Sequence, residues 1–126
     1  MDAPKKPPVE KKDWGVTRTL LRGPVLIFHA SIEAGGFCSR HYHKNRINYF
    51  YVISGKVNVV VFDEFRQSEV VRTHTLRAGQ TLAVDPGVVH RFEALEKTEL
   101  LEVYWGKLDE NDIVRFDTGG IVAAKT

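Results

Sequence analysis

Gly35-Gly-Phe-Cys-Ser-Arg-His-Tyr-His-Lys-Asn-Arg-Ile-Asn-Tyr-Phe-Tyr-Val-Ile-Ser-Gly55 is the stretch of the chain that decides the fold. It is bounded by glycines, and its Ser54-Gly55 dipeptide separates two apolar, β-rich runs, which is typical of a tight hairpin. Within it, His41 and His43 are one residue apart. Because side chains on a strand alternate between its two faces, both histidines are expected to point to the same side and to reach one metal ion.

A second glycine-bounded segment supplies a third histidine. The segment is Gly79-Gln-Thr-Leu-Ala-Val-Asp-Pro-Gly-Val-Val-His-Arg-Phe92, and its histidine is His90. Three histidines that converge from two strands would form the start of a metal site, since imidazole ligands suit zinc, iron, nickel or copper. The sequence therefore predicts a bound divalent transition metal and leaves its identity open among zinc, iron, nickel and manganese.

The rest of the ordered chain consists of short β-rich runs separated by turn signals. We expect strands at 16–22, 25–33, 37–43, 48–54, 56–62, 69–76, 81–85, 89–95 and 98–106. No long segment has helical periodicity, and at most one helical turn is expected, at 109–116. Many short strands at nearly even spacing predict an all-β sandwich or barrel.

Length and composition describe one ordinary globular domain. The chain has 126 residues and a net charge of +2, too small to argue for a nucleic-acid partner. Residues 1–13 are rich in proline and charge and are expected to be a disordered tail, followed by a barrel domain at 14–126. The single cysteine, the lack of a secretory signal and the lack of a long apolar run predict a cytoplasmic protein without a membrane partner.

Strand alternation also predicts which side chains line the inside of the barrel. Phe37 and Ser39 should share the inner face with the two histidines, whereas Cys38 is expected to be a buried, inert thiol. The other inward residues are expected to be Asn48, Phe50, Val52, His90, Phe92, Ala94, Leu100, Glu102 and Tyr104. Together they would form a mostly apolar pocket with a few convergent polar groups, which is the usual composition of a small-molecule site.

The two glycine-bounded segments resemble the paired motifs of the cupin family, over roughly residues 14 to 118. The resemblance implies a jelly-roll barrel of the double-stranded β-helix type, with His41, His43 and His90 as metal ligands. Asn48 stands where the family usually has a fourth ligand, a glutamate, and Asp85 stands where it usually has proline. An amide oxygen brings a dipole where a carboxylate brings a charge, so affinity should fall and the ion should become a stronger Lewis acid.

Within that family the chain is most similar to the C-terminal cupin domain of the bifunctional phosphomannose isomerase / mannose-1-phosphate guanylyltransferases. The matching pieces are Trp14-Gly15, His43-Lys-Asn-Arg46-Ile-Asn48-Tyr-Phe50, Gly87-Val-Val-His-Arg-Phe92 and Asn111-Asp-Ile-Val-Arg-Phe116. The resemblance implies isomerisation of a sugar phosphate, with Arg46, or less directly Arg115, binding the phosphate. Glu102 is the remaining inward carboxylate that could act as the base. The residues expected to contact substrate are Arg46, Phe50, Phe92, Tyr104 and Arg115.

Three differences from that domain leave the function open. Asn48 replaces the ligand glutamate, Thr118-Gly-Gly-Ile121 replaces a terminal Tyr-Gly-Arg, and the nucleotidyltransferase half does not occur in the chain. The alternatives are a metal-poor, non-catalytic module that binds a carbohydrate or small metabolite, and a three-histidine iron dioxygenase. A homodimer is also expected, because aromatic side chains on outward positions are typical of an interface. These residues are Tyr42, Tyr49, Tyr51 and Trp105.

Overall fold

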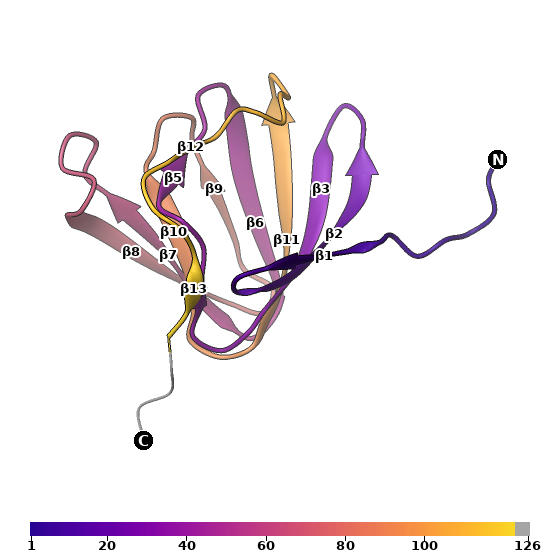
Figure 1. The fold of residues 1–126 in the computed structure, drawn as a ribbon, viewed down its shortest axis with the longest axis horizontal. Coiled ribbons are helices and arrows are strands. Elements are labelled where there is room, and N and C mark those ends of the chain that lie inside the picture. The colour runs from indigo at the N-terminus through magenta and orange to yellow at the C-terminus, as the bar shows by residue number, and fades with distance from the viewer. Residues whose placement is uncertain (123–126) are drawn as a thin grey trace.

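Two antiparallel sheets face each other in the computed structural model, which describes residues 1–122 (Figure 1). One sheet runs in the order β1 (Val9–Lys12), β2 (Gly15–Arg22), β3 (Leu26–Ile32), β11 (Thr98–Gly106), β6 (Arg46–Ser54) and β9 (Thr81–Val84). The other runs β12 (Val114–Arg115), β5 (His41–Tyr42), β10 (His90–Ala94), β4 (Gly36–Phe37) and β13 (Gly120–Ile121), and β7 (Lys56–Phe62) pairs with β10 and with β8 (Val70–Arg77). The expected all-β fold is confirmed.

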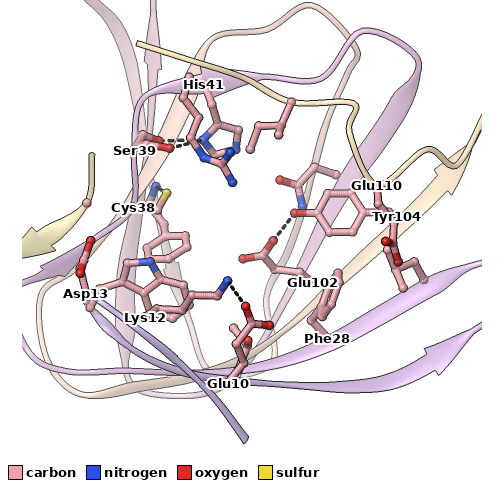
Figure 2. Close-up of a pocket in the computed structure, with 18 of the residues that line it drawn as sticks. Glu10, Lys12, Asp13, Phe28, Cys38, Ser39, His41, Glu102, Tyr104 and Glu110 are labelled. Atoms are coloured by element: carbon pink, nitrogen blue, oxygen red, sulfur yellow. Dashed lines mark hydrogen bonds and ion pairs between the residues drawn. The ribbon is translucent and has the colours of Figure 1, made fainter. Parts of the chain in front are cut away.

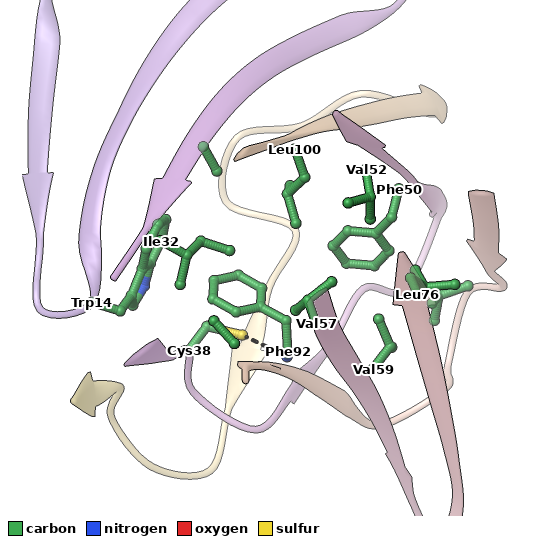
Figure 3. Close-up of a cluster of buried hydrophobic side chains, with 13 residues drawn as sticks. Trp14, Ile32, Cys38, Phe50, Val52, Val57, Val59, Leu76, Phe92 and Leu100 are labelled. Carbon is green, nitrogen blue, oxygen red and sulfur yellow. Dashed lines mark hydrogen bonds between the residues drawn. The ribbon is translucent and has the colours of Figure 1, made fainter. Parts of the chain in front are cut away.

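The hydrophobic core fills the space between the sheets (Figure 3). Trp14 packs edge to face on Phe92, with ring centroids 4.9 Å apart. Strand alternation supplies the remaining core side chains, since every second residue of β6, β7 and β11 points inward. Burial of one such side chain stabilises the fold by about 1.5–3 kcal/mol. The core residues include Ile32, Phe50, Val52, Val57, Val59, Leu76, Phe92 and Leu100.

Most predicted strands agree with β2, β3, β6, β7, β8, β9, β10 and β11 to within two residues at each end. The strand predicted at 37–43 is wrong in its middle, because the chain leaves the sheet between β4 and β5. This break disrupts the expected alternation, since Ser39 lines the pocket as expected but Cys38 lines it too. Cys38 lies in the core and accepts a hydrogen bond from the Phe92 N–H at 3.2 Å, whereas Phe37 lies outside, with its ring 5.1 Å from the Arg91 guanidinium.

Two further expectations fail near the ends of the chain. The helical turn predicted at 109–116 is wrong, because this segment forms turns and then strand β12. Strand β1 lies inside the segment predicted to be a disordered tail, and its Val9 to Lys12 pair with Arg18 to Gly15 of β2. Residues 1–8 have no regular secondary structure. In the described part of the chain, no helix has the length and hydropathy needed to cross a bilayer.

Candidate metal centre

His41, His43 and His90 come together inside the barrel. His41 belongs to β5, His43 follows that strand, and the β5–β10 register sets His90 directly opposite His41. All three are buried, and one ring nitrogen of each lies within 4.8 Å of the others. The sequence prediction that these histidines converge is therefore met in the folded chain.

Backbone carbonyls fix the orientation of all three imidazoles. Nδ1 of His41 lies 2.7 Å from the carbonyl oxygen of Ser39. Nδ1 of His43 lies 2.7 Å from that of Asp112, and Nδ1 of His90 lies 2.9 Å from that of Val88. Since a carbonyl only accepts, each Nδ1 carries the proton and each Nε2 is left with a free lone pair. An imidazole that ligates a metal is held by its other nitrogen in this way.

Two buried polar atoms in the cluster have no hydrogen-bond partner, and a third faces another acceptor. His43 Nε2 has no hydrogen-bond partner, and neither has Asn48 Nδ2. His90 Nε2 faces Asn48 Oδ1 at 3.1 Å, so two acceptors oppose each other once Nδ1 of His90 is protonated. A rotated Asn48 amide would satisfy His90 alone, whereas one shared cation would satisfy both histidines and the amide oxygen. The donor set therefore fits a divalent metal.

Burial keeps the three histidines neutral. It lowers the pKa of His43 and of His90 to about 4. Burial also lowers the pKa of His41 well below its usual value, and the neighbouring His90 and His43 add to the effect. Because only neutral imidazole binds metal, no proton has to be displaced from Nε2 near neutral pH.

Asp112 is a site residue that the sequence reasoning did not single out. Its backbone carbonyl orients His43, and its carboxylate accepts hydrogen bonds from the N–H groups of Lys44 at 2.7 Å and Asn45 at 2.9 Å. Burial raises the pKa of this carboxyl, but the two N–H groups outweigh burial and leave the pKa below its usual value. The Asn111–Phe116 run that carried the resemblance contains this residue. The sequence resemblance at this run is thus the signal from which Asp112 could have been predicted as a site residue.

A pocket of about 590 Å³ opens next to the histidines (Figure 2). Glu102 and Tyr104 lie on its wall, and the Tyr104 hydroxyl donates a hydrogen bond to Glu102 Oε2. Burial raises the pKa of the Glu102 carboxyl, and the Tyr104 hydrogen bond opposes that shift. Burial and the charge of Glu102 raise the pKa of Tyr104, so its hydroxyl stays protonated. The pocket thus combines candidate metal ligands with a carboxyl group, that of Glu102, whose pKa is raised.

Arg46 is a buried cation without an ion-pair partner among the described residues. It is 6% exposed, lines the pocket, and stacks on Tyr104 with its guanidinium carbon 4.1 Å from the ring centre. Its Nε lies 3.2 Å from His43 Nδ1, but that nitrogen already gives its proton to the closer Asp112 carbonyl. The guanidinium therefore keeps hydrogen-bond donors for an anion in the pocket.

The remaining predicted site residues occupy different depths. Phe50 and Phe92 line the pocket floor but also belong to the core, at 1% and 3% exposure. Arg115 is exposed at the pocket rim, on β12. It makes no ion pair within residues 1–122.

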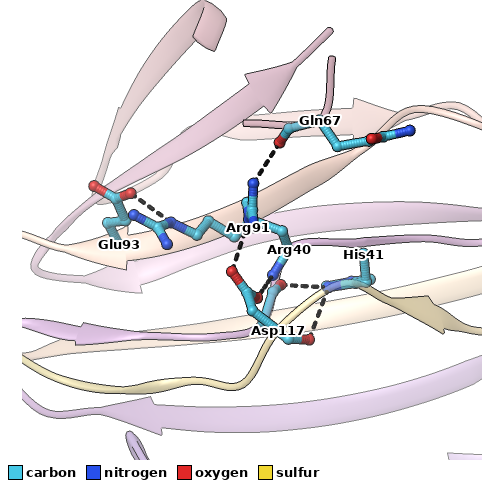
Figure 4. Close-up of polar contacts among 7 residues, drawn as sticks. Arg40, His41, Gln67, Arg91, Glu93 and Asp117 are labelled. Carbon is cyan, nitrogen blue, oxygen red and sulfur yellow. Dashed lines mark hydrogen bonds and ion pairs between the residues drawn. The ribbon is translucent and has the colours of Figure 1, made fainter. Parts of the chain in front are cut away.

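A polar clamp holds the segment that leads into His41 (Figure 4). Asp117 Oδ1 accepts the backbone N–H of Arg40 at 2.6 Å, and its Oδ2 accepts Nε of the same arginine at 2.7 Å. Arg40 Nη1 also donates to the carbonyl of Gln67 at 2.7 Å. This clamp fixes Arg40 in the break between β4 and β5, between Ser39, whose carbonyl contacts the His41 ring, and His41 itself.

Solved structures with this fold include enzymes and one protein of similar size. Oxalate decarboxylase from Lactobacillus farciminis superposes with a TM-score of 0.70 at 19% identity over 87% of this chain. CapF superposes with a TM-score of 0.74 at 17% identity over 91% of this chain. The chain spans only 34% and 35% of those two proteins. KdgF from Halomonas sp. superposes with a TM-score of 0.69 at 14% identity, with 82% of this chain and 89% of that protein covered.

These identities show a common fold and carry no activity over to this chain. No curated protein matches the sequence. The family model described as "Cupin domain" matches residues 28–105, which include all three histidines, Asn48 and Glu102. Together with the two facing sheets and the buried histidine cluster, this match shows that the chain belongs to the cupin family.

Proposed function

We propose that this protein binds a divalent metal through three histidines and holds a small anionic, polyhydroxylated ligand, such as a sugar phosphate, beside it. The observation that carries the proposal is the cluster of three Nε2 lone pairs, each aimed by a backbone carbonyl on Nδ1. His41, His43, His90 and the Asn48 amide oxygen would hold the ion. When bound, the metal supplies Lewis-acid polarisation of a ligand oxygen, undiminished by any charged ligand.

The anionic part of the ligand is inferred from Arg46. This nearly buried guanidinium has no carboxylate partner among the described residues, and a phosphate or carboxylate could accept two of its N–H groups at once. Arg115 adds a second positive charge at the rim. The polyhydroxylated part rests on the likeness of the sequence motifs to the phosphomannose isomerase cupin domain.

Glu102 is the proposed general base for an aldose–ketose isomerisation. The reaction moves a proton between two neighbouring carbons, and the base must lie in the pocket with its pKa shifted toward neutrality. Glu102 meets both requirements, and the Tyr104 hydroxyl holds its carboxylate in place. Phe50 and Phe92 would form the apolar floor under the ligand.

Asn48 favours a second candidate, a binding module without turnover. The amide in place of a carboxylate weakens metal binding and removes one inward acid from the pocket. In that case Arg46 and the pocket walls would still bind the ligand. The two candidates differ in whether a bound sugar exchanges a carbon-bound proton.

Proton exchange in heavy water tests the proposal. Metal-loaded protein is incubated with mannose 6-phosphate, and deuterium at the carbon next to the carbonyl is followed by NMR. We expect exchange by the wild type and a loss of about a hundredfold or more in Glu102→Gln, within the usual contribution of a general base. Glu99→Gln is the matched control, since Glu99 lies on the same strand but pairs with His29 on the outer face.

Metal-dependent binding without exchange would support the binding module and sink the isomerase. Uptake of oxygen by the ferrous form would instead indicate the oxygenase. Exchange that is equally fast in Glu102→Gln would remove Glu102 from the role of base.

A further inference from the structure

The first hairpin of the chain crosses the mouth of the pocket. The pocket lining includes Glu10, Lys11, Lys12 and Asp13 of this hairpin. Figure 2 shows Lys12 with its ammonium group directed into the pocket, on the side where Glu102 lies. All four residues of β1 are exposed, and in the described sheet β1 pairs with β2 alone. The strand therefore contributes little to the core, and its side chains are free to meet a ligand.

The base of the hairpin is firmly anchored. Trp14 is buried on Phe92, and its carbonyl accepts the Glu33 N–H at 3.0 Å. Gly15 has a φ of +153°, and a Cβ there would lie 2.0 Å from the Ser31 carbonyl oxygen. Because this turn is pinned to the barrel, the neighbouring Lys12 has a defined place at the mouth.

The ion pair that Lys12 makes is weak and can be exchanged. Its Nζ lies 3.0 Å from Glu10 Oε1, and the two side chains are 36% and 67% exposed. Such exposed pairs typically contribute little to the stability of a protein. The Lys12 charge also reaches Glu102, where it works against the larger effect of burial on the pKa of that carboxyl. An anion entering the pocket would thus meet an ammonium group held only by Glu10.

We propose that Lys12 is a ligand-binding residue that exchanges Glu10 for an oxyanion, a phosphate or a carboxylate, on the ligand. This rests on the anionic ligand of the proposed function and adds a second cation to Arg46. The hairpin then acts as one wall of the site, and Glu10 competes with the ligand for Lys12. Removal of Lys12 should weaken anion binding, and removal of Glu10 should strengthen it.

Trp14 provides the readout, because it lies in the pocket lining next to Lys12. The titrations use zinc-loaded protein in a Trp105→Phe background, so that Trp14 is the sole tryptophan. The probes are inorganic phosphate, mannose 6-phosphate, glucuronate and uncharged mannose. We expect Lys12→Gln to weaken binding of those anions that contact Lys12 by about three- to tenfold, as for the loss of one charged contact.

Three companion variants sharpen the result. Glu10→Gln should tighten anion binding. Lys12→Arg keeps the positive charge and should bind the anions about as well as the wild type. Lys6→Gln removes the same charge outside the pocket lining and should leave anion binding unchanged. If Lys12→Gln weakens binding of phosphate and mannose 6-phosphate only, the group that Lys12 contacts is a phosphate. If it weakens binding of glucuronate only, that group is a carboxylate. Mannose should not respond to Lys12→Gln.

Equal anion affinity in Lys12→Gln and wild type would overturn this inference while leaving the proposed function intact. A matching loss of mannose binding would also overturn it, since the hairpin would then serve only as structure. If the zinc-loaded wild type binds none of the three anions, the anionic ligand of the proposed function is wrong, and the role of Lys12 falls with it. Zinc content, measured on the same samples, should be equal in all variants.

Discussion

Asp112 shows how one residue can position a metal ligand without touching the metal. Its carbonyl selects the tautomer of His43, and its carboxylate ties down the two N–H groups that follow that histidine. Both interactions come from a segment far along the chain, so the C-terminal part of the protein reaches back to the metal centre. The same logic applies to Asp117, which holds Arg40 just ahead of His41.

Asp112→Ala should therefore weaken metal binding as well as stability. Loss of a carboxylate that accepts two partly buried N–H groups should cost about 1–3 kcal/mol in the free energy of unfolding. The matched control is Asp63→Ala, because Asp63 accepts the N–H groups of Phe65 and Arg66 in a loop remote from the histidines. Urea unfolding measures the loss of stability, and competition with a chelator for zinc measures the loss of metal affinity. A zinc affinity as high in Asp112→Ala as in Asp63→Ala would show that the Asp112 carboxylate is not needed to keep His43 in place.

At the residue scale, the sequence predicted what local spacing controls. The same-side placement of His41 and His43 and the convergence of His90 follow from strand alternation and from the paired glycine-bounded segments. The inward positions of Phe50, Glu102 and Tyr104 follow from the same alternation. The roles of Asp112 and Asp117 depend on contacts across 60 or more residues, roughly half the chain, which no local pattern contains.

At the scale of the elements, Gly55 forms the hairpin between β6 and β7. Its φ is +92°, and a Cβ there would lie 2.3 Å from the Lys97 carbonyl oxygen. Gly79, between β8 and β9, has a similar φ of +84° but open space around it. The two positions thus share the backbone strain and differ only in crowding.

Gly55→Ala should consequently be more destabilising than Gly79→Ala. The strain of positive φ alone should cost about 1–2 kcal/mol in Gly79→Ala, and the clash with the β10–β11 connection at Lys97 should add to that cost in Gly55→Ala. Urea unfolding of both variants measures the difference. Equal losses would mean that the β6–β7 turn can move away from Lys97 and that crowding there is unimportant.

The strands with an apolar pattern of their own were predictable, whereas β1, β12 and β13 were not. β2, β3, β6, β7 and β11 carry enough alternating apolar residues to be recognised. β1 consists of exposed, mostly charged residues, so its pairing depends on β2 rather than on its own pattern. β12 and β13 have two residues each and exist because the C-terminal segment lies along β5 and β4.

For the whole molecule, the buried histidines make the stability of the metal-free protein depend on pH. The unfolded chain takes up protons on histidine near pH 6.5, whereas His43 and His90 in the folded protein do so only near pH 4. The unfolded state thus binds more protons in that window, so stability is complete above pH 6.5 and declines as the pH falls toward 4. The slope should be at most about 1.4 kcal/mol per pH unit for each histidine.

Urea unfolding of metal-free protein at several pH values between 7 and about 4.5 measures this slope. A His43→Gln/His90→Gln double variant should have a smaller slope than the wild type. An identical slope in both proteins would show that other groups account for the acid sensitivity.

The homodimer remains a prediction. Of the outward aromatic residues, Tyr51 is 40% exposed, and Ile53 beside it on the same face is 46% exposed. Tyr42 packs partly on Phe116, and Tyr49 partly on Trp105. We expect sedimentation velocity at about tens of micromolar protein to show a dimer that Tyr51→Glu dissociates, since a charge in an apolar interface is costly. A monomeric wild type at that concentration would remove the prediction.

The metal itself is the central claim, and elemental analysis tests it most directly. Protein purified without a metal-affinity tag is stripped, equilibrated with zinc, ferrous iron, manganese or nickel, desalted and measured, beside Asn48→Glu and a variant with all three histidines replaced by alanine. The account predicts about one metal ion per wild-type chain, tighter retention in Asn48→Glu and none in the triple variant, because the three aimed Nε2 atoms form the site. Wild-type protein that retains no more metal than the triple variant, with metal appearing only in Asn48→Glu, would contradict it.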